Sequence, residues 1–115
     1  MSGIQRQPLD GVLLCGRMVA RPGMRQALVD LLIDVAQIAG EREPGCLGVS
    51  VHLDVASEDV VVLYEHYADE AAFAEHRANY ERYEDYGRMR TRLGELLAEP
   101  PQITRLTGIA RFVRA

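Results

Sequence analysis

One stretch of the chain, Val60 to Tyr80, passes from a strand pattern to a helix pattern within two residues. It begins with four β-favouring aliphatic residues, Val60 to Leu63, and continues with four side chains capable of polar chemistry, Tyr64 to Tyr67. Asp69 then stands where a helix N-cap is expected, because its carboxylate can accept from the free amides of the first turn. The good helix formers EAAFAEHRA follow. The stretch predicts a buried strand whose end carries polar side chains, followed at once by a helix.

The predicted helix carries a histidine on the same face as two aromatic rings. Phe73, His76 and Tyr80 are spaced three and four residues apart, and this spacing places side chains on one side of a helix. Because imidazole titrates near neutrality, His76 is a candidate base or hydrogen-bond donor. The alternative is a structural histidine that braces the helix.

The length of 115 residues predicts one domain with a core of its own. Residues 1–10 are polar and irregular in pattern, which predicts a flexible N-terminal tail, and residues 11–115 form the domain. The net charge of −4 argues against a nucleic acid or an anionic membrane as partner, and favours a small molecule. Cys15 and Cys46 lie inside apolar segments, which is typical of reduced thiols in a cytoplasmic protein.

Strands and helices alternate along the remaining chain. We expect strands at Val12–Ala20, Cys46–Val55 and Ile103–Val113, a helix from the Pro22-Gly23 turn to Gly40, and a third helical stripe from Tyr80 to Leu97 that stops at Pro100-Pro101. This order predicts an α+β fold with a split βαβ arrangement, in which helices cover one face of an antiparallel four-stranded sheet.

Two of the expected strands are apolar on both faces. Val12 to Cys15 and Val60 to Leu63 carry apolar side chains at both odd and even positions, and this pattern indicates burial on both sides of a sheet. Because the helices cover only one side, we expect the other side to pack on a second copy of the chain in an isologous homodimer.

Several short motifs are similar, in their order and spacing, to one known family. They are Pro22-Gly23, Glu43-Pro44-Gly45-Cys46, Tyr64-Glu65-x-Tyr67, Ala72 with His76, and Glu99-Pro100-Pro101. Together they resemble the antibiotic biosynthesis monooxygenase (ABM) family from Val12 to about Arg105. The resemblance implies a ferredoxin-like dimeric α+β barrel with a substrate cavity between sheet and helices. Members of that family include cofactor-independent oxygenases of quinols and anthrones, quinol oxygenases of general metabolism and haem-degrading enzymes.

The haem-degrading branch fits the sequence less well. That branch resembles a pattern with an asparagine in the first strand, a tryptophan ending the third, and a histidine ligand about ten residues beyond the position of His76. Here the first strand has no asparagine, the third ends in Tyr67, and the ligand position falls on Tyr86.

Metal and nucleotide signatures are absent from the sequence. His52, His66 and His76 have no short ligand spacing, the two cysteines form no CxxC, and no GxGxxG or GxxxxGK occurs. We therefore expect no cofactor and no metal. Acid–base chemistry in an apolar cavity remains, because a deprotonated quinol can pass an electron to dioxygen.

The candidate catalytic residues are His76, Tyr67 and Glu65, and the candidate substrate-binding residues are Tyr64, Phe73, Tyr80, Tyr83 and Arg90. The tyrosines can stack on a planar substrate or belong to plain core. Glu65 either has a raised pKa in the cavity or pairs with an arginine such as Arg17, and the pair is the favoured interpretation. Arg90 can balance a phenolate or extend to water.

The sequence thus predicts a cofactor-independent monooxygenase that oxidises an aromatic quinol or anthrone-like polyketide with dioxygen. The alternatives are a non-catalytic small-molecule-binding domain, an isomerase of a small carbonyl compound and, with less support, a haem-degrading enzyme.

Overall fold

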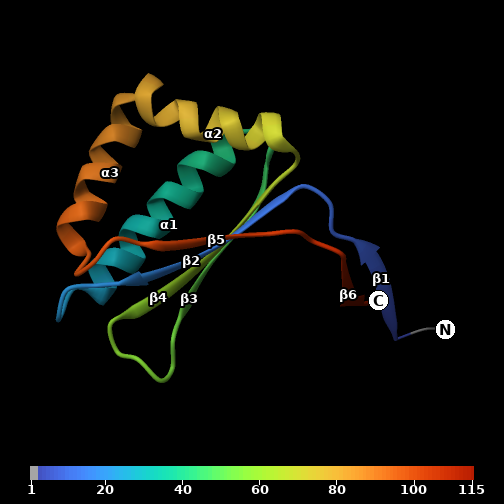
Figure 1. Cartoon of the computed structure of the whole chain (residues 1–115), viewed down its shortest axis with the longest axis horizontal. Helices are drawn as coiled ribbons and strands as arrows, with labels where there is room; N and C mark the ends of the chain where they lie inside the picture. Colours follow the sequence, from blue (N-terminus) through green and yellow to red (C-terminus); the bar gives the residue numbers. More distant parts are fainter. Residues whose placement is uncertain (1–2) are drawn as a thin grey trace.

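A computed structural model describes residues 3–115 of the chain (Figure 1). The elements are β1 (Ile4–Pro8), β2 (Val12–Val19), α1 (Arg25–Arg42), β3 (Cys46–Leu53), β4 (Val60–Tyr67), α2 (Glu70–Arg82), α3 (Glu84–Leu96), β5 (Gln102–Leu106) and β6 (Ala110–Arg114). None of the helices among these residues is long and apolar enough to cross a membrane.

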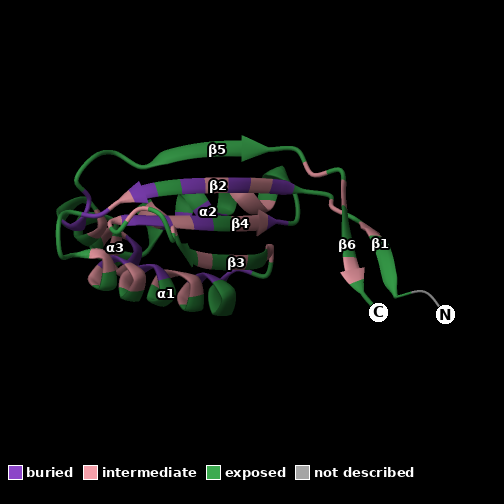
Figure 2. Cartoon of the chain, turned by 90° about the horizontal axis from the view of Figure 1, so that it is seen from below, coloured by how far each residue is buried: buried purple, intermediate pink, exposed green. Residues whose placement is uncertain are grey.

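The main sheet has four antiparallel strands in the order β3-β4-β2-β5, and all three helices lie on one of its faces (Figures 1 and 2). This arrangement confirms the predicted α+β, ferredoxin-like fold. The strands β1 and β6 form a separate two-stranded ribbon.

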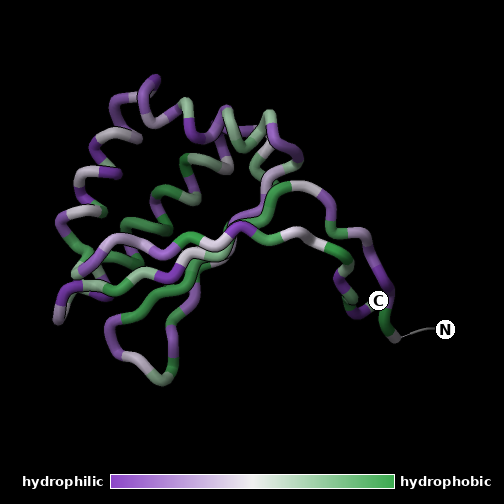
Figure 3. The backbone as a smooth tube through the Cα atoms, viewed as in Figure 1, coloured by the Kyte–Doolittle hydropathy of each residue, from purple (hydrophilic) through white to green (hydrophobic). Residues whose placement is uncertain are grey.

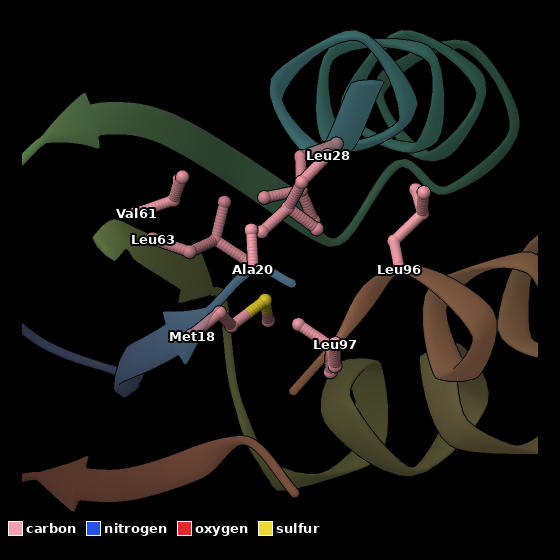
Figure 4. Close-up of a cluster of buried hydrophobic side chains, with 8 residues drawn as sticks. Met18, Ala20, Leu28, Val61, Leu63, Leu96 and Leu97 are labelled. Atoms are coloured by element: carbon pink, nitrogen blue, oxygen red, sulfur yellow. The ribbon is translucent and has the colours of Figure 1, made fainter. Parts of the chain in front are cut away.

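The hydrophobic core lies between the helices and the two central strands. Hydrophobic residues concentrate along β2, β4 and α1 in Figure 3. Figure 4 shows Leu28 of α1 above Val61 and Leu63 of β4, with Leu96 and Leu97 closing the cluster from the end of α3. Leu28 and Val61 are fully buried. Each buried aliphatic side chain of this kind contributes about 1.5–3 kcal/mol to folding.

Alternation along β4 sorts its side chains between two environments. Val61, Leu63 and Tyr67 are buried on the face toward the helices, whereas Tyr64 is exposed on the other face. Glu65 shares the helix-covered face and His66 shares the outer one. The polar side chains at the end of this strand are therefore divided between the two faces.

Two single residues determine the path of the chain near the end of β4. The Asp69 carboxylate accepts from the Ala72 amide at 2.8 Å, which confirms the predicted cap of α2. Gly11, with a φ of 105°, stands so close to the end of β4 that a Cβ atom would lie 2.2 Å from the Tyr67 carbonyl oxygen. Only glycine fits this close approach.

Three predicted boundaries need correction. Helix α1 continues past Gly40 to Arg42, because Gly40 is an exposed helix position and the extended backbone begins only at Glu43. The predicted last strand is two strands, β5 and β6, separated by residues 107–109. Residues 4–8, expected to be irregular, form β1 by pairing with β6, a long-range contact that local pattern does not reveal. Residues 1 and 2 of the expected tail lie outside the described residues.

Candidate active site

A chain of five polar side chains runs through the space between the sheet and helix α2. It consists of Tyr86, Glu43, His76, Glu65 and Tyr67, in that spatial order. Four different segments supply them: α3 carries Tyr86, the loop after α1 carries Glu43, α2 carries His76, and the end of β4 carries Glu65 and Tyr67. The fold therefore assembles a site that no single segment contains.

His76 lies between the two carboxylates. Its Nδ1 atom is 2.9 Å and 3.0 Å from the two oxygens of Glu43, and its Nε2 atom is 3.9 Å from Oε1 of Glu65. Because a carboxylate only accepts, Nδ1 carries the proton in the bond to Glu43. This bond leaves Nε2 as the nitrogen that can exchange a proton.

Each carboxylate is also held by a tyrosine. The Tyr67 hydroxyl donates to Oε1 of Glu65 at 2.6 Å, and the Tyr86 hydroxyl donates to Oε2 of Glu43. Glu43 has an exposed fraction of 4%, so its charge depends on these donors. Among the described residues, no buried side-chain nitrogen or oxygen lacks a hydrogen-bond partner. Apart from Nε2 of His76, which lies 3.9 Å from Glu65, the chain is therefore a hydrogen-bonded polar network inside an apolar layer.

The three tyrosines of the site stay protonated over the ordinary pH range. Burial raises the pKa of the Tyr67 phenol far above its usual value, and the neighbouring Glu65 charge adds to the shift. Burial and the hydrogen bond to Glu43 raise the pKa of Tyr86. Burial, followed by the charge of Glu65, raises the pKa of Tyr80 to about 12.

Aromatic rings enclose His76. Its ring centroid lies 5.0 Å from that of Tyr67 and 5.4 Å from that of Tyr80, and Tyr67 in turn lies 5.4 Å from Phe73. His76 points inward, with an exposed fraction of 8%. The structure thus brings together five predicted site residues: His76, Tyr67, Glu65, Phe73 and Tyr80.

Two other predicted residues lie at the margin of this cluster. Tyr83 stacks under the Arg42 guanidinium at 4.1 Å and touches Tyr86 with centroids 5.9 Å apart. The Arg90 guanidinium lies 5.3 Å from the Tyr80 ring and pairs with Glu81 at 3.1 Å in an exposed position. Arg90 is therefore already balanced by a carboxylate and extends toward water.

Two expectations are wrong in their geometry. Tyr64 does not join the cluster, because alternation turns it to the outer face, where it meets the His52 ring at 5.5 Å. Glu65 does not pair with Arg17: the register places Arg17 opposite Val62, on the outer face, and Glu65 opposite Leu14, on the inner one. The Glu65 carboxylate instead lies beside Tyr67 and His76.

Glu43 and Tyr86 are the site residues that the sequence analysis missed as candidates. Glu43 belongs to the EREPG loop, where an acidic residue is unremarkable, yet this loop enters the interior between α1 and β3. Tyr86 lies on the apolar stripe of α3, which indicates burial without revealing a polar partner. Tyr86 occupies the position at which the haem-degrading branch has its histidine ligand, but its hydroxyl donates a hydrogen bond to Glu43.

The described hollows are open surface grooves. The one nearest the cluster has a volume of about 710 Å³ and lies at the elbow between α2 and α3, with Tyr80, Tyr83, Gly87 and Thr91 among its lining residues. A second groove of about 440 Å³ lies between α1 and α3. His76 itself is packed by the rings around it. Within residues 3–115 no group of three or more His, Cys, Asp or Glu side chains is arranged to hold a metal ion.

Comparison with protein-family models identifies one family. Residues 12–89 match the sequence model of the family described as antibiotic biosynthesis monooxygenase. The structure of Rv0793 from Mycobacterium tuberculosis is similar, with 30% sequence identity, a TM-score of 0.70, and coverage of 84% of this chain and 92% of that chain. No curated protein sequence matches this chain.

Two further solved structures are similar in fold. A mutant of SnoaB, a cofactor-independent oxygenase from Streptomyces nogalater, has 17% identity and a TM-score of 0.72 over 85% of this chain and 92% of that chain. A protein from Caulobacter crescentus has 20% identity and a TM-score of 0.76 over 89% of this chain and 93% of that chain. At these identities the likeness concerns the fold alone.

Proposed function

Because this chain belongs to the antibiotic biosynthesis monooxygenase family, we propose that it is a cofactor-independent monooxygenase acting on an aromatic quinol or an anthrone-like polyketide. The observation that carries this proposal is a buried imidazole whose Nδ1 is fixed by one carboxylate and whose Nε2 faces another. SnoaB, which shares the fold, is described as a cofactor-independent oxygenase, and this description supports the reaction class.

His76 is the proposed base. Glu43 fixes the tautomer and stabilises the imidazolium that forms when Nε2 takes a proton, as the orienting carboxylate does in other histidine-based sites. The Nε2–Glu65 distance of 3.9 Å is too long for a direct hydrogen bond, so a substrate hydroxyl between them can donate to either group. Tyr67 holds the Glu65 carboxylate in place for this exchange.

The proposed reaction requires only dioxygen as oxidant. Loss of a proton from the carbon between the rings of an anthrone gives a carbanion, which passes one electron to dioxygen. The resulting carbon radical and superoxide combine through a new carbon–oxygen bond, and the peroxide takes up a proton. Water then leaves as the oxygen–oxygen bond breaks and the second hydrogen departs as a proton, so anthrone and dioxygen give quinone and water. The protein supplies the base and holds the planar ring.

We propose that the substrate approaches from the groove at the α2–α3 elbow. Tyr80 lines this groove and also packs against His76, so a shift of the Tyr80 ring would open a path from the groove to Nε2 of the imidazole. Tyr83 lines the same groove and offers a second stacking surface. Phe73 supports the far side of Tyr67.

We also propose a homodimer that forms through the outer face of the sheet, and a cytoplasmic location. Tyr64 and Leu106 expose 46% and 40% of their surface there, beside the half-buried Leu13 and Val62. The free cysteines Cys15 and Cys46 are in keeping with a reducing compartment.

Oxygen uptake with a panel of hydroquinones and anthrones tests the activity. We expect uptake by the wild-type protein, a loss of about 100-fold or more in His76→Gln, and a smaller loss in Tyr67→Phe. His52→Gln, which alters an exposed histidine on β3, is the matched control and should keep full activity.

The same assay separates the alternatives. Binding of the panel without oxygen uptake would contradict the enzyme and favour a domain that sequesters the ligand. Turnover that continues under nitrogen would instead indicate an isomerase. Circular dichroism of each variant shows whether a lost activity reflects a lost fold.

A further inference from the structure

His76 lies between two carboxylates, and this position by itself works against a base. Its Nδ1 atom contacts Glu43 at 2.9 Å, and its Nε2 atom lies 3.9 Å from Glu65. A nearby charge of opposite sign favours the charged form of an ionisable group, so two carboxylates together favour an imidazolium. An imidazolium carries a proton on both nitrogens and cannot accept another. The site therefore needs a feature that weakens the attraction of these carboxylates for a second proton on the ring.

Two tyrosine hydroxyls, one on each carboxylate, supply this feature. Tyr86 donates to Oε2 of Glu43, and Tyr67 donates to Oε1 of Glu65 at 2.6 Å. A donor that binds an ionised carboxylate disperses its charge and favours the ionised form. Burial is the main cause that raises the pKa of both phenols, so both remain donors over the ordinary pH range. Each carboxylate therefore attracts a proton to the imidazole less than it would without its tyrosine.

Tyr86 has the stronger position of the two tyrosines. Its partner Glu43 contacts the imidazole with both oxygens, at 2.9 Å and 3.0 Å, whereas Glu65 is 3.9 Å away. Tyr86 and Glu43 are both buried. A hydrogen bond to a charged group is stronger in such surroundings than in water. Loss of the Tyr86 hydroxyl should therefore affect His76 more than loss of the Tyr67 hydroxyl.

An ion pair at the surface holds Tyr86 and Glu43 together. Arg42, the residue before Glu43, pairs with Asp85, the residue before Tyr86, at 2.9 Å and 3.1 Å. Oδ1 of Asp85 also accepts from the Tyr86 amide at 2.9 Å, and the Arg42 guanidinium lies 5.3 Å from the centre of the Tyr86 ring. The ion pair thus joins the end of α1 to the start of α3, and it keeps the Tyr86 hydroxyl on Glu43.

We propose that Tyr86 is a positioning residue of the reaction, which by donating to Glu43 keeps Nε2 of His76 free of a proton at neutral pH. This inference rests on the proposed function, in which Nε2 is the base. Tyr86 acts through Glu43, because its hydroxyl is bonded to that carboxylate. The other titratable and charged groups around the pair are Cys46 of β3, Glu65 and Tyr67 of β4, Tyr80 of α2 and, farther out, Arg42, Asp85 and Arg90. Tyr86→Phe leaves all of them in place.

Titration of His76 in three Tyr→Phe variants tests this role without any substrate. Nuclear magnetic resonance of ¹⁵N-labelled histidine reports whether Nε2 carries a proton, and the His76 signal is assigned by its absence from His76→Gln. Tyr86→Phe should raise the pH at which Nε2 gains its proton by about one unit or more, because it removes a hydrogen bond to a buried charge. Tyr67→Phe should raise it less, since Glu65 is farther from the ring. Tyr64→Phe, the matched control on the outer face, should leave it unchanged.

The pH profile of oxygen uptake gives a second readout. In Tyr86→Phe its acidic limb should move to higher pH by the same amount, while the rate above that limb stays within about threefold of the wild-type rate. Asp85→Asn, which leaves the Tyr86 ring in the core, weakens the surface ion pair and should move the titration in the same direction by less.

The two readouts separate this role from the proposed function. An unchanged His76 titration in Tyr86→Phe would overturn the proposal, and uptake reduced equally at every pH would then show that Tyr86 serves the fold alone. If circular dichroism shows that Tyr86→Phe does not fold, an unchanged titration in Asp85→Asn overturns the proposal instead. A titration that shifts as expected in a protein without oxygen uptake would support the role of Tyr86 and contradict only the proposed function.

Discussion

Tyr64 and Tyr67 lie three residues apart on one strand, yet they occupy opposite environments. Tyr67 is fully buried, donates to Glu65 at 2.6 Å and packs against Phe73 and His76. Tyr64 exposes 46% of its surface on the outer face and meets only the edge of His52 among the described rings. Both tyrosines belong to strand β4, so the difference in their burial comes from the helices, which cover only the face that carries Tyr67.

The same contrast holds for the histidines. His76 on the inner side has a carboxylate at Nδ1, whereas Nε2 of His52 on the outer side forms a hydrogen bond with the Ser50 hydroxyl at 2.7 Å in an exposed position. A buried polar group without its partner is costly, whereas an exposed one turns to water. Within a single chain, the loss of a polar partner should therefore cost more on the inner face than on the outer face.

The largest effect expected is on folding stability at the two tyrosines. Tyr67→Ala should lower the free energy of unfolding by about 3–5 kcal/mol, because it removes a buried aromatic side chain and leaves a cavity. Tyr64→Ala should lower it far less. Urea denaturation of both variants at the same protein concentration measures the difference, and equal losses would break the contrast between the faces.

The next effect concerns the partners of the two histidines. Glu43→Ala removes the acceptor of both His76 and Tyr86, and should cost about 2–4 kcal/mol since each buried unsatisfied donor costs about 1–3 kcal/mol. Ser50→Ala removes the partner of the exposed His52 and should be nearly neutral. Thermal unfolding of the two variants measures both losses of stability. An equal loss in Glu43→Ala and Ser50→Ala would contradict this account.

A smaller effect appears at alkaline pH. The pKa of Tyr80 is about 12 in the folded chain and about 10 in an unfolded one, so above pH 10 the unfolded state loses protons first. Stability from this residue is complete below pH 10 and decreases as the pH rises toward 12. Tyr80→Phe should therefore reduce the loss of stability between pH 10 and 11 by about 1 kcal/mol. An unchanged pH dependence in urea denaturation would indicate that the Tyr80 ring is not shielded by burial.

Much of the fold could be predicted because its signals are local. Four aliphatic residues in β4 and the Asp69 cap fixed the boundary between strand and helix to within a residue or two. The ends of the chain could not be predicted in this way. Strand β1 exists only because it pairs with β6, and that pairing joins residues more than 100 positions apart, as in Ile4 with Arg114.

The site was predictable only in part, for a related reason. His76 and Tyr67 stood out because polar groups interrupt an apolar pattern, and alternation alone separates Tyr64 from Tyr67. Glu43 did not stand out, because a charged residue in a loop usually faces water. Its burial depends on how α1 and β3 meet beneath α3, and spacing along the chain contains no information on that contact.

Proton exchange on a substrate under nitrogen measures the base directly, without the oxygen chemistry that follows. Anthrone is dissolved in deuterated buffer with the protein, and nuclear magnetic resonance follows loss of the hydrogens on its central carbon. We predict that the wild-type protein accelerates the exchange, that His52→Gln does so equally, and that His76→Gln is slower by about 100-fold or more. Exchange that is as fast in His76→Gln as in the wild type would contradict the assignment of His76 as the base.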